Sequence, residues 1–180
     1  VQLAQGDLVG ALVSFEQDLQ LARKLAEGDP ANAAWQRNLS VSLDKLGEVQ
    51  LAQGDLAGAH ASIEQSLAIR RKLAESDPAN TEWQRELSVS FNRLGGVQLA
   101  QNNLTTARAS FDRGLRIRRK LAESDPANIG WQHELSLNYD KLGGVQLAQK
   151  DLTGARASFE HGLRIRSEER RVGKECRSRW

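Results

Sequence analysis

Apolar residues recur along the chain with the spacing of amphipathic helices. In residues 83–97 they are separated by steps of four, four, three and three, which places them on one face of a helix with 3.6 residues per turn. The positions are Trp83, Leu87, Phe91, Leu94 and Val97. The same stripe occurs in residues 35–49 and 131–145. The pattern therefore predicts three helices of one kind, which we call A helices.

A second helix, called helix B, is predicted after each A helix. In the middle of the chain a polar turn at Asn102-Asn103 is followed by apolar positions that begin at Leu104 and continue on one helical face. This helix ends before Asp125-Pro126, because proline disfavours helical backbone in the residue that precedes it. Asn128 then stands where an asparagine caps the start of the next A helix.

The helix pairs form an internal repeat of 48 residues. The segment Asp-Pro-Ala-Asn recurs at this spacing, and residues 1–48 share 32 identities with residues 49–96. A pair of helices cannot bury its apolar faces alone, so successive units must stack. We therefore predict an all-α protein, a right-handed α-solenoid of antiparallel helix pairs with seven full or partial helices. The predicted units are residues 1–31 (partial), 32–79, 80–127 and 128–165 (partial).

The units resemble tetratricopeptide repeats. The resemblance is carried by Leu94-Gly95 in helix A, the turn before Leu104, and Ala107, Phe111 and Gly114-Leu115 in helix B, with parallel sets in the other units. The 48-residue length is similar to that of kinesin-light-chain repeats. Glycine inside a helix costs about 1 kcal/mol relative to alanine, so Gly47, Gly95 and Gly143 predict a close approach by the following helix B.

The resemblance implies a non-catalytic scaffold that binds a protein or peptide in a concave groove lined by the A helices. Polar positions that flank the Leu-Gly pair would point into this groove. They are Asp44, Lys45, Glu48, Asn92, Arg93, Asp140 and Lys141. The alternative use of these side chains is a solvated surface. The cations of helix B, such as Arg70, Arg71 and Lys72, are expected on the solvated convex side.

Residues 166–180 depart from the repeat. Residues 167–176 match residues 119–128 at no position, and the segment RSEERRVGKECRSRW resembles the translation of a sequencing-library adapter. The alternative is a native basic tail that caps the solenoid or binds an acidic partner. The last B helix is expected to continue through Glu168-Glu169-Arg170 and to end near Gly173. Without this tail the chain has 19 basic and 20 acidic residues, a net charge of −1 instead of +2.

Composition and residue spacing argue against nucleic-acid binding, a membrane span and a metal site. The corrected charge gives no support to nucleic-acid binding, no apolar run approaches the roughly 20 residues that cross a membrane, and the single cysteine, Cys176, lies in the tail. His60, His133 and His161 occupy three phases of the repeat and have no metal-binding spacing. We therefore predict a cytoplasmic protein that is not an enzyme, with no metal, cofactor, nucleic acid or membrane ligand.

Two interpretations remain open. Sequences of this kind also occur beside catalytic domains, so the chain could form the sensor arm of a larger bacterial signalling enzyme, a nucleotide-dependent switch or a protease. The aligned tryptophans Trp35, Trp83 and Trp131 favour core packing, with a stacking platform for bases or ligands as the alternative.

Overall fold

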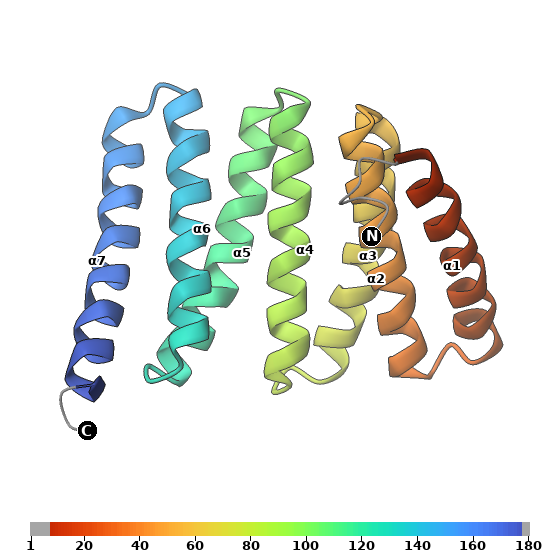
Figure 1. Cartoon of the computed structure of the whole chain (residues 1–180), viewed down its shortest axis with the longest axis horizontal. Coiled ribbons are helices and arrows are strands. Elements are labelled where there is room, and N and C mark those ends of the chain that lie inside the picture. The colour runs from red at the N-terminus through yellow and green to blue at the C-terminus, as the bar shows by residue number, and fades with distance from the viewer. Residues whose placement is uncertain (1–7, 178–180) are drawn as a thin grey trace.

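The computed structural model describes residues 8–177, which form seven helices placed side by side in antiparallel order (Figure 1). The helices are α1 (Leu8–Gly28), α2 (Ala33–Ala52), α3 (Leu56–Ser76), α4 (Thr81–Ala100), α5 (Leu104–Ser124), α6 (Ile129–Ala148) and α7 (Leu152–Arg177). This range contains no strand, and each helix packs mainly against the next one in the chain. The predicted all-α solenoid of helix pairs is confirmed.

The even-numbered helices are the predicted A helices, and the odd-numbered helices are the B helices. In the view of Figure 1, α4 and α6 lie in front of α5. None of the helices formed by residues 8–177 combines the length and the apolar composition needed to cross a membrane.

The helix ends follow the local signals in the sequence. The side chain of Asn128 accepts a hydrogen bond from the Trp131 N–H at 3.1 Å, and Asn80 caps Trp83 in the same way. At the turn from helix A to helix B, Gly54, Asn102 and Lys150 have φ values of 82°, 60° and 64°. This left-handed conformation ends the A helix and is readily adopted by glycine and asparagine.

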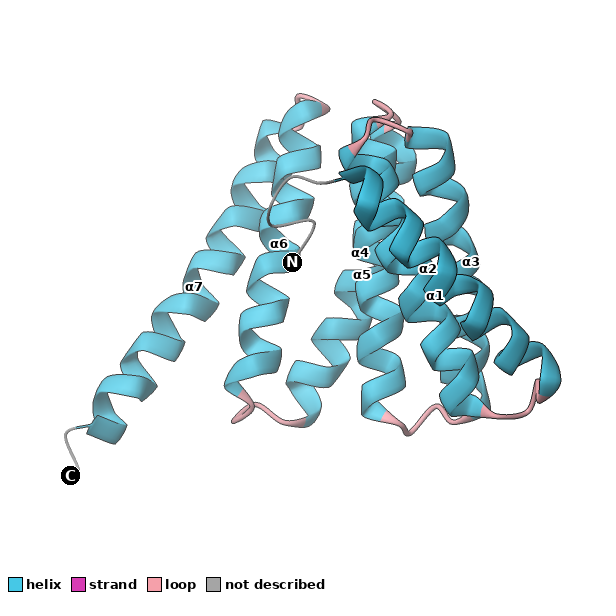
Figure 2. Ribbon diagram, turned by 45° about the vertical axis from the view of Figure 1, so that its right-hand side comes forward, coloured by secondary structure: helices cyan, strands magenta, loops and turns pink. Residues whose placement is uncertain are grey.

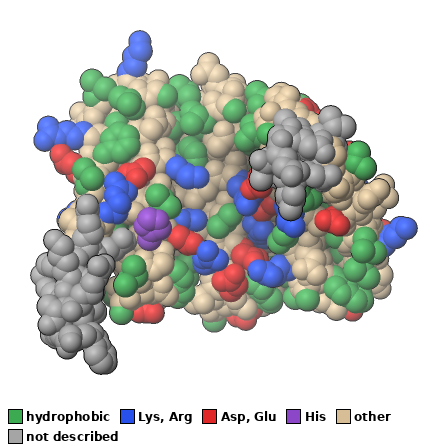
Figure 3. Space-filling view, in the orientation of Figure 1, with side chains coloured by type: hydrophobic (Ala, Val, Ile, Leu, Met, Phe, Trp, Pro, Cys, Tyr) green, Lys and Arg blue, Asp and Glu red, His purple; other side chains and the backbone are tan. Residues whose placement is uncertain are grey.

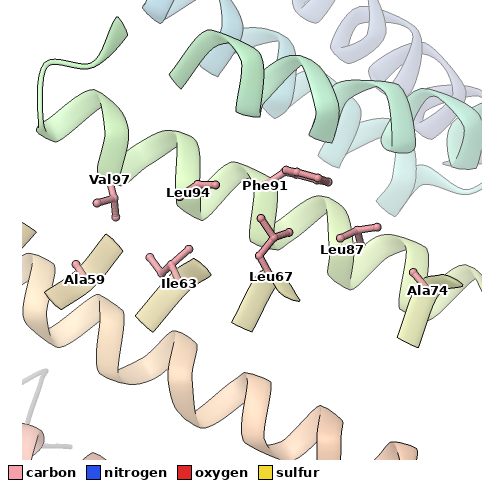
Figure 4. Packing of buried hydrophobic residues seen from close by; sticks show 8 residues of the cluster. All are labelled: Ala59, Ile63, Leu67, Ala74, Leu87, Phe91, Leu94 and Val97. Atoms are coloured by element: carbon pink, nitrogen blue, oxygen red, sulfur yellow. The ribbon is translucent and has the colours of Figure 1, made fainter. Parts of the chain in front are cut away.

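The core lies between neighbouring A and B helices, both within a unit and between successive units. Figure 4 shows the central cluster, in which Ala59, Ile63, Leu67 and Ala74 of α3 face Leu87, Phe91, Leu94 and Val97 of α4. A Cβ atom added to Gly95 would lie 2.7 Å from the Phe111 ring, and one added to Gly47 would lie 2.9 Å from Ile63. The predicted close approach of helix B to these glycines is confirmed.

The aligned tryptophans are less buried than the sequence predicts. Trp83 and Trp131 are half-buried and pack against the clusters of their units, whereas Leu87 and Leu135 on the same stripes are buried. Each tryptophan stands within three residues of the helix start, where the helix extends past its neighbours' apolar faces. The packing interpretation therefore holds, with part of each indole in water.

Helix α7 is longer than predicted. It continues through Gly173 to Arg177, and Figure 2 shows its last turns leaning away from α6. A single glycine costs a helix about 1 kcal/mol, and the high helix propensity of the surrounding Glu, Arg and Lys residues can offset this cost. Arg166 still follows the repeat: its guanidinium lies 2.6 Å from the Asp140 carboxylate on α6.

Deletion of residues 167–180 is expected to leave the free energy of unfolding within about 0.5 kcal/mol of the full chain. In the shortened chain, Arg166→Ala should then cost about 1 kcal/mol, because it removes a partly exposed ion pair. Urea unfolding followed by circular dichroism measures both changes. A loss above about 2 kcal/mol from the deletion alone would show that the tail stabilises the solenoid.

Candidate functional site

The A helices form a face with a cavity at its centre. The cavity has a volume of about 310 Å³ and lies between α2, α4 and α6, with one residue from α5. Its lining residues are Glu48, Val89, Asn92, Arg93, Arg118, Leu137, Asn138 and Lys141. We call it the A-helix cavity. Figure 3, in the orientation of Figure 1, shows positive and negative side chains next to one another over the middle of this face.

Four of the seven predicted groove residues line this cavity. Glu48, Asn92, Arg93 and Lys141 come together from three successive units, although up to 93 positions separate them in the chain. Lys45 occupies the same repeat position as Lys141 but stands over the Phe15 ring at 5.7 Å, outside the cavity. The other two predicted residues, Asp44 and Asp140, have ion-pair partners within the fold.

Asp44 belongs to a buried ion pair. Its carboxylate lies 2.8 Å from Arg70 Nη1, and both side chains are buried, with 3% and 6% of their surface exposed. Arg70 also donates to the Ser40 and Ser90 hydroxyls at 3.1 and 3.0 Å, so it links α3 to both neighbouring A helices. The expectation that Arg70 is a solvated convex residue is therefore wrong, whereas Arg71 and Lys72 are exposed.

Ion pairs between successive units also occupy other charged residues of the A helices. Arg37 on α2 pairs with Glu86 on α4 at 2.5 Å, and one repeat later Arg85 on α4 pairs with Glu134 on α6 at 2.6 Å. Hydrogen bonds to these glutamates raise the pKa values of both arginines. These residues hold the units in register.

Polar contacts also join the walls of the A-helix cavity. Arg93 forms an ion pair with Glu48, and the amide of Asn138 donates to the buried Asn92 side chain. Arg93 remains about one-third exposed and Glu48 about half exposed, so both side chains can still reach a ligand. Asn92 is buried and positions its neighbours instead.

The floor of the cavity carries a buried cation, Arg118, whose guanidinium lies 3.9 Å from the Glu134 carboxylate. Arg118 is buried and donates to the Ser88 hydroxyl and the Glu134 carbonyl, and burial lowers its pKa. The corresponding arginines, Arg70 and Arg166, each have an aspartate partner on their own unit's A helix, but α4 has Asn92 at that position. Burial and the nearby positive charges of Arg118 and Arg93 lower the pKa of Lys141.

Sequence reasoning missed Arg118 and Asn138 as cavity residues. Arg118 lies on a B helix, and its place among helix cations masks its burial. One signal was available: the central unit replaces the aspartate at position 44 and 140 of its neighbours with Asn92. The aspartate that pairs with the buried arginine in the neighbouring units is therefore missing beside Arg118 in the central unit.

The structure groups no metal ligands or general bases in the described range. Residues 8–177 contain no cluster of three or more His, Cys, Asp or Glu side chains that could hold a metal ion. His60 lies 3.5 Å from the Glu64 carboxylate, whereas His161 stacks on Tyr139 with 5.1 Å between ring centroids. The arrangement can recognise charged and amide groups.

Comparisons with known proteins agree with the helix-pair architecture. A tetratricopeptide repeat family model matches residues 39–80, which is less than the length of one 48-residue unit. Crystal structures of nearly identical TPR-like repeats from Podosopora anserina, described under the kinesin light chain name, align with TM-scores of 0.55 and, for a point variant, 0.54. The identity is 16% in both; the alignments cover 93% and 94% of this chain and 90% and 92% of those chains. No curated protein matches the sequence.

Proposed function

Because the chain is a tetratricopeptide repeat protein, we propose that it is a non-catalytic scaffold whose A-helix cavity binds an extended peptide segment of a partner protein. The observation that carries this proposal is the charge of the cavity. Three cations, Arg93, Arg118 and Lys141, line it together with one carboxylate, Glu48. A carboxylate from the peptide would favour the charged form of Lys141, whose pKa is lowered by burial and by repulsion from Arg118 and Arg93.

The cavity also offers room for the main chain of a peptide. Gly96 and Gly144 lie on the A helices one position after the Leu-Gly pair, and a Cβ atom added to either would meet no other atom within 4 Å. Val89 and Leu137 supply apolar contacts at the same cavity. An extended segment with one acidic side chain fits this combination of apolar surface and cations. In this proposal the module acts in the cytoplasm without a cofactor, nucleic acid or membrane.

Lys141→Gln is expected to weaken binding of an acidic peptide about tenfold or more, because a charge-assisted hydrogen bond contributes about 1.5–3 kcal/mol. The measurement is an array of peptides screened with the wild-type chain, followed by titration of the best binder. Lys45→Gln is the matched control, since Lys45 has the same repeat position outside the cavity. Equal losses in both variants would contradict the proposal.

The affinity should also depend on pH in a defined direction. Because the pKa of Lys141 lies below that of an ordinary lysine, its positive charge is lost earlier as the pH rises. A bound carboxylate favours the charged form, so binding at alkaline pH should take up protons. Calorimetry in buffers of different ionisation enthalpy measures this uptake, which Lys141→Gln should abolish.

A further inference from the structure

A larger cavity lies on the opposite side of α4. It has a volume of about 640 Å³ and is lined by the loop after α3, by α4 and by the B helix α5. Gln84 and Phe91 line this groove and are two helical turns apart on one side of α4. Val89 and Arg93, about half a turn from Phe91, line the A-helix cavity instead. We call the new cavity the B-helix groove.

The floor of the groove is an aromatic ring held between two cations. The guanidinium carbon of Arg71, from α3, lies 5.9 Å from the centroid of the Phe91 ring, and that of Arg113, from α5, lies 5.8 Å from it. A guanidinium that stacks on a ring keeps its N–H donors in its own plane, directed past the ring edge. Both guanidinium groups lie close to the Phe91 ring, and Arg113 itself lines the groove, so both can pair with a carboxylate bound there.

The cations of the groove have no acidic partners. Arg113, Arg116 and Lys120 line it, and none of its lining residues is acidic. Within the described residues, no carboxylate forms an ion pair with Arg71, Arg113 or Lys120. The arginines of the A-helix face are different, because Arg37, Arg85 and Arg93 each pair with a glutamate. Arg71, Arg113 and Lys120 thus leave positive charge open to a partner on the B-helix side.

The same groove has an apolar part. Ile117 and Leu121 of α5 line it beside Phe91, so one side chain of a ligand can be buried next to the cations. A second groove, of about 630 Å³, lies at the next junction and also has an aromatic ring and cations, although Glu123 lines it too. There Tyr139 replaces Phe91, Arg119 donates to the Tyr139 hydroxyl at 2.8 Å, and His161 stacks on the ring. At the preceding junction the equivalent of Phe91 is Leu43, so this aromatic floor belongs to the last two junctions.

We propose that the B-helix groove binds an acidic segment of a partner protein, with one apolar side chain over Ile117 and Leu121 and carboxylates beside Arg71 and Arg113. Charge complementarity identifies the occupant, and the apolar floor favours a peptide over a phosphodiester chain, which has no aliphatic side chain to bury. This site lies on the other side of α4 from the A-helix cavity, so each can fail independently of the other.

The test uses the full chain and fluorescent ten-residue peptides of Glu and Asp with a central leucine. The expected result is binding that falls on the order of tenfold in the double variant Arg71→Gln/Arg113→Gln, and falls again when alanine replaces the peptide's leucine. Lys45→Gln/Lys150→Gln is the matched control, because it removes two positive charges that line neither the B-helix groove nor the A-helix cavity. Fluorescence polarisation measures affinity, and circular dichroism verifies that both variants keep their helices.

Four outcomes would overturn the proposal. The first is that the wild-type chain does not bind the leucine peptide. The second is that the control variant loses as much affinity as the groove variant, which would indicate only long-range attraction by net charge. The third is a single-stranded oligonucleotide that displaces the peptide and binds more tightly, which would identify a nucleic acid as the ligand. The fourth is a loss of affinity in Lys141→Gln with none in the groove variant, which would place the acidic peptide in the A-helix cavity.

Discussion

Asp44→Ala is expected to lower the free energy of unfolding by about 3–5 kcal/mol, because it leaves the guanidinium of Arg70 buried without its partner. The nearest remaining carboxylate oxygen, Glu86 Oε2, lies 4.0 Å from Arg70 Nε, beyond hydrogen-bond distance, and the other oxygen of Glu86 accepts from Arg37. Compensation inside the fold is therefore small. Urea unfolding followed by the helical circular dichroism signal measures the loss.

Asp44→Asn is the informative control for this experiment. The next unit already has Asn92 at the equivalent position, and its buried arginine, Arg118, is held by the Ser88 hydroxyl and a backbone carbonyl. An amide can still accept a hydrogen bond from Arg70, so the substitution should cost distinctly less than Asp44→Ala. If Asp44→Ala proved nearly neutral, Arg70 would have to reach water by a local rearrangement, and the ion pair would not organise the fold.

Phe111→Ala is expected to cost about 3–5 kcal/mol of unfolding free energy. The ring is 2% exposed and fills the space over Gly95, which has no side chain of its own to occupy the cavity that would remain. The same measurement applies. A loss below about 1 kcal/mol would mean that α4 and α5 move together and close the space.

Because Phe111 packs on Gly95, the effect of Gly95→Ala on the free energy of unfolding should change sign when Phe111 is removed. In the wild-type chain, Gly95→Ala should destabilise, since its Cβ would lie 2.7 Å from a ring carbon. In the Phe111→Ala background the same change should stabilise by up to about 1 kcal/mol, because alanine favours the helix and the space is open. Gly96→Ala is the control, with nothing within 4 Å of its added Cβ, and should stabilise in both backgrounds.

Much of the candidate site could be found from sequence because the repeat copies its geometry. Once one unit is known to be a helix pair, residues 48 positions apart must occupy equivalent places, and so Glu48, Arg93 and Lys141 could be assigned to one face. The same reasoning could not separate Lys45 from Lys141. Both follow the pattern, but Lys141 lines a cavity shared with the A helices of the two preceding units, whereas the only described helix before α2 is α1, a B helix.

Periodicity and local chain chemistry by themselves determined the helices, their order and their ends. The apolar stripes set the buried faces, Asn128 and the Pro126 turn set the boundaries, and Gly95 required a close neighbour. These properties depend on residues within one or two turns of each other, or on strict repetition. The helical continuation of α7 past Gly173 shows the limit of such signals, because a glycine weakens a helix without ending it.

The use of the charged residues was decided only by the tertiary structure. On one helix, Arg70 and Arg71 are adjacent cations of the same type, yet Arg70 is buried against Asp44 and Arg71 lies over the Phe91 ring. The outcome depends on which carboxylate or ring the neighbouring helices bring within a few ångströms. Coulomb energy and desolvation both vary steeply over that distance, so the same charge is structural at one position and open to a partner at the next.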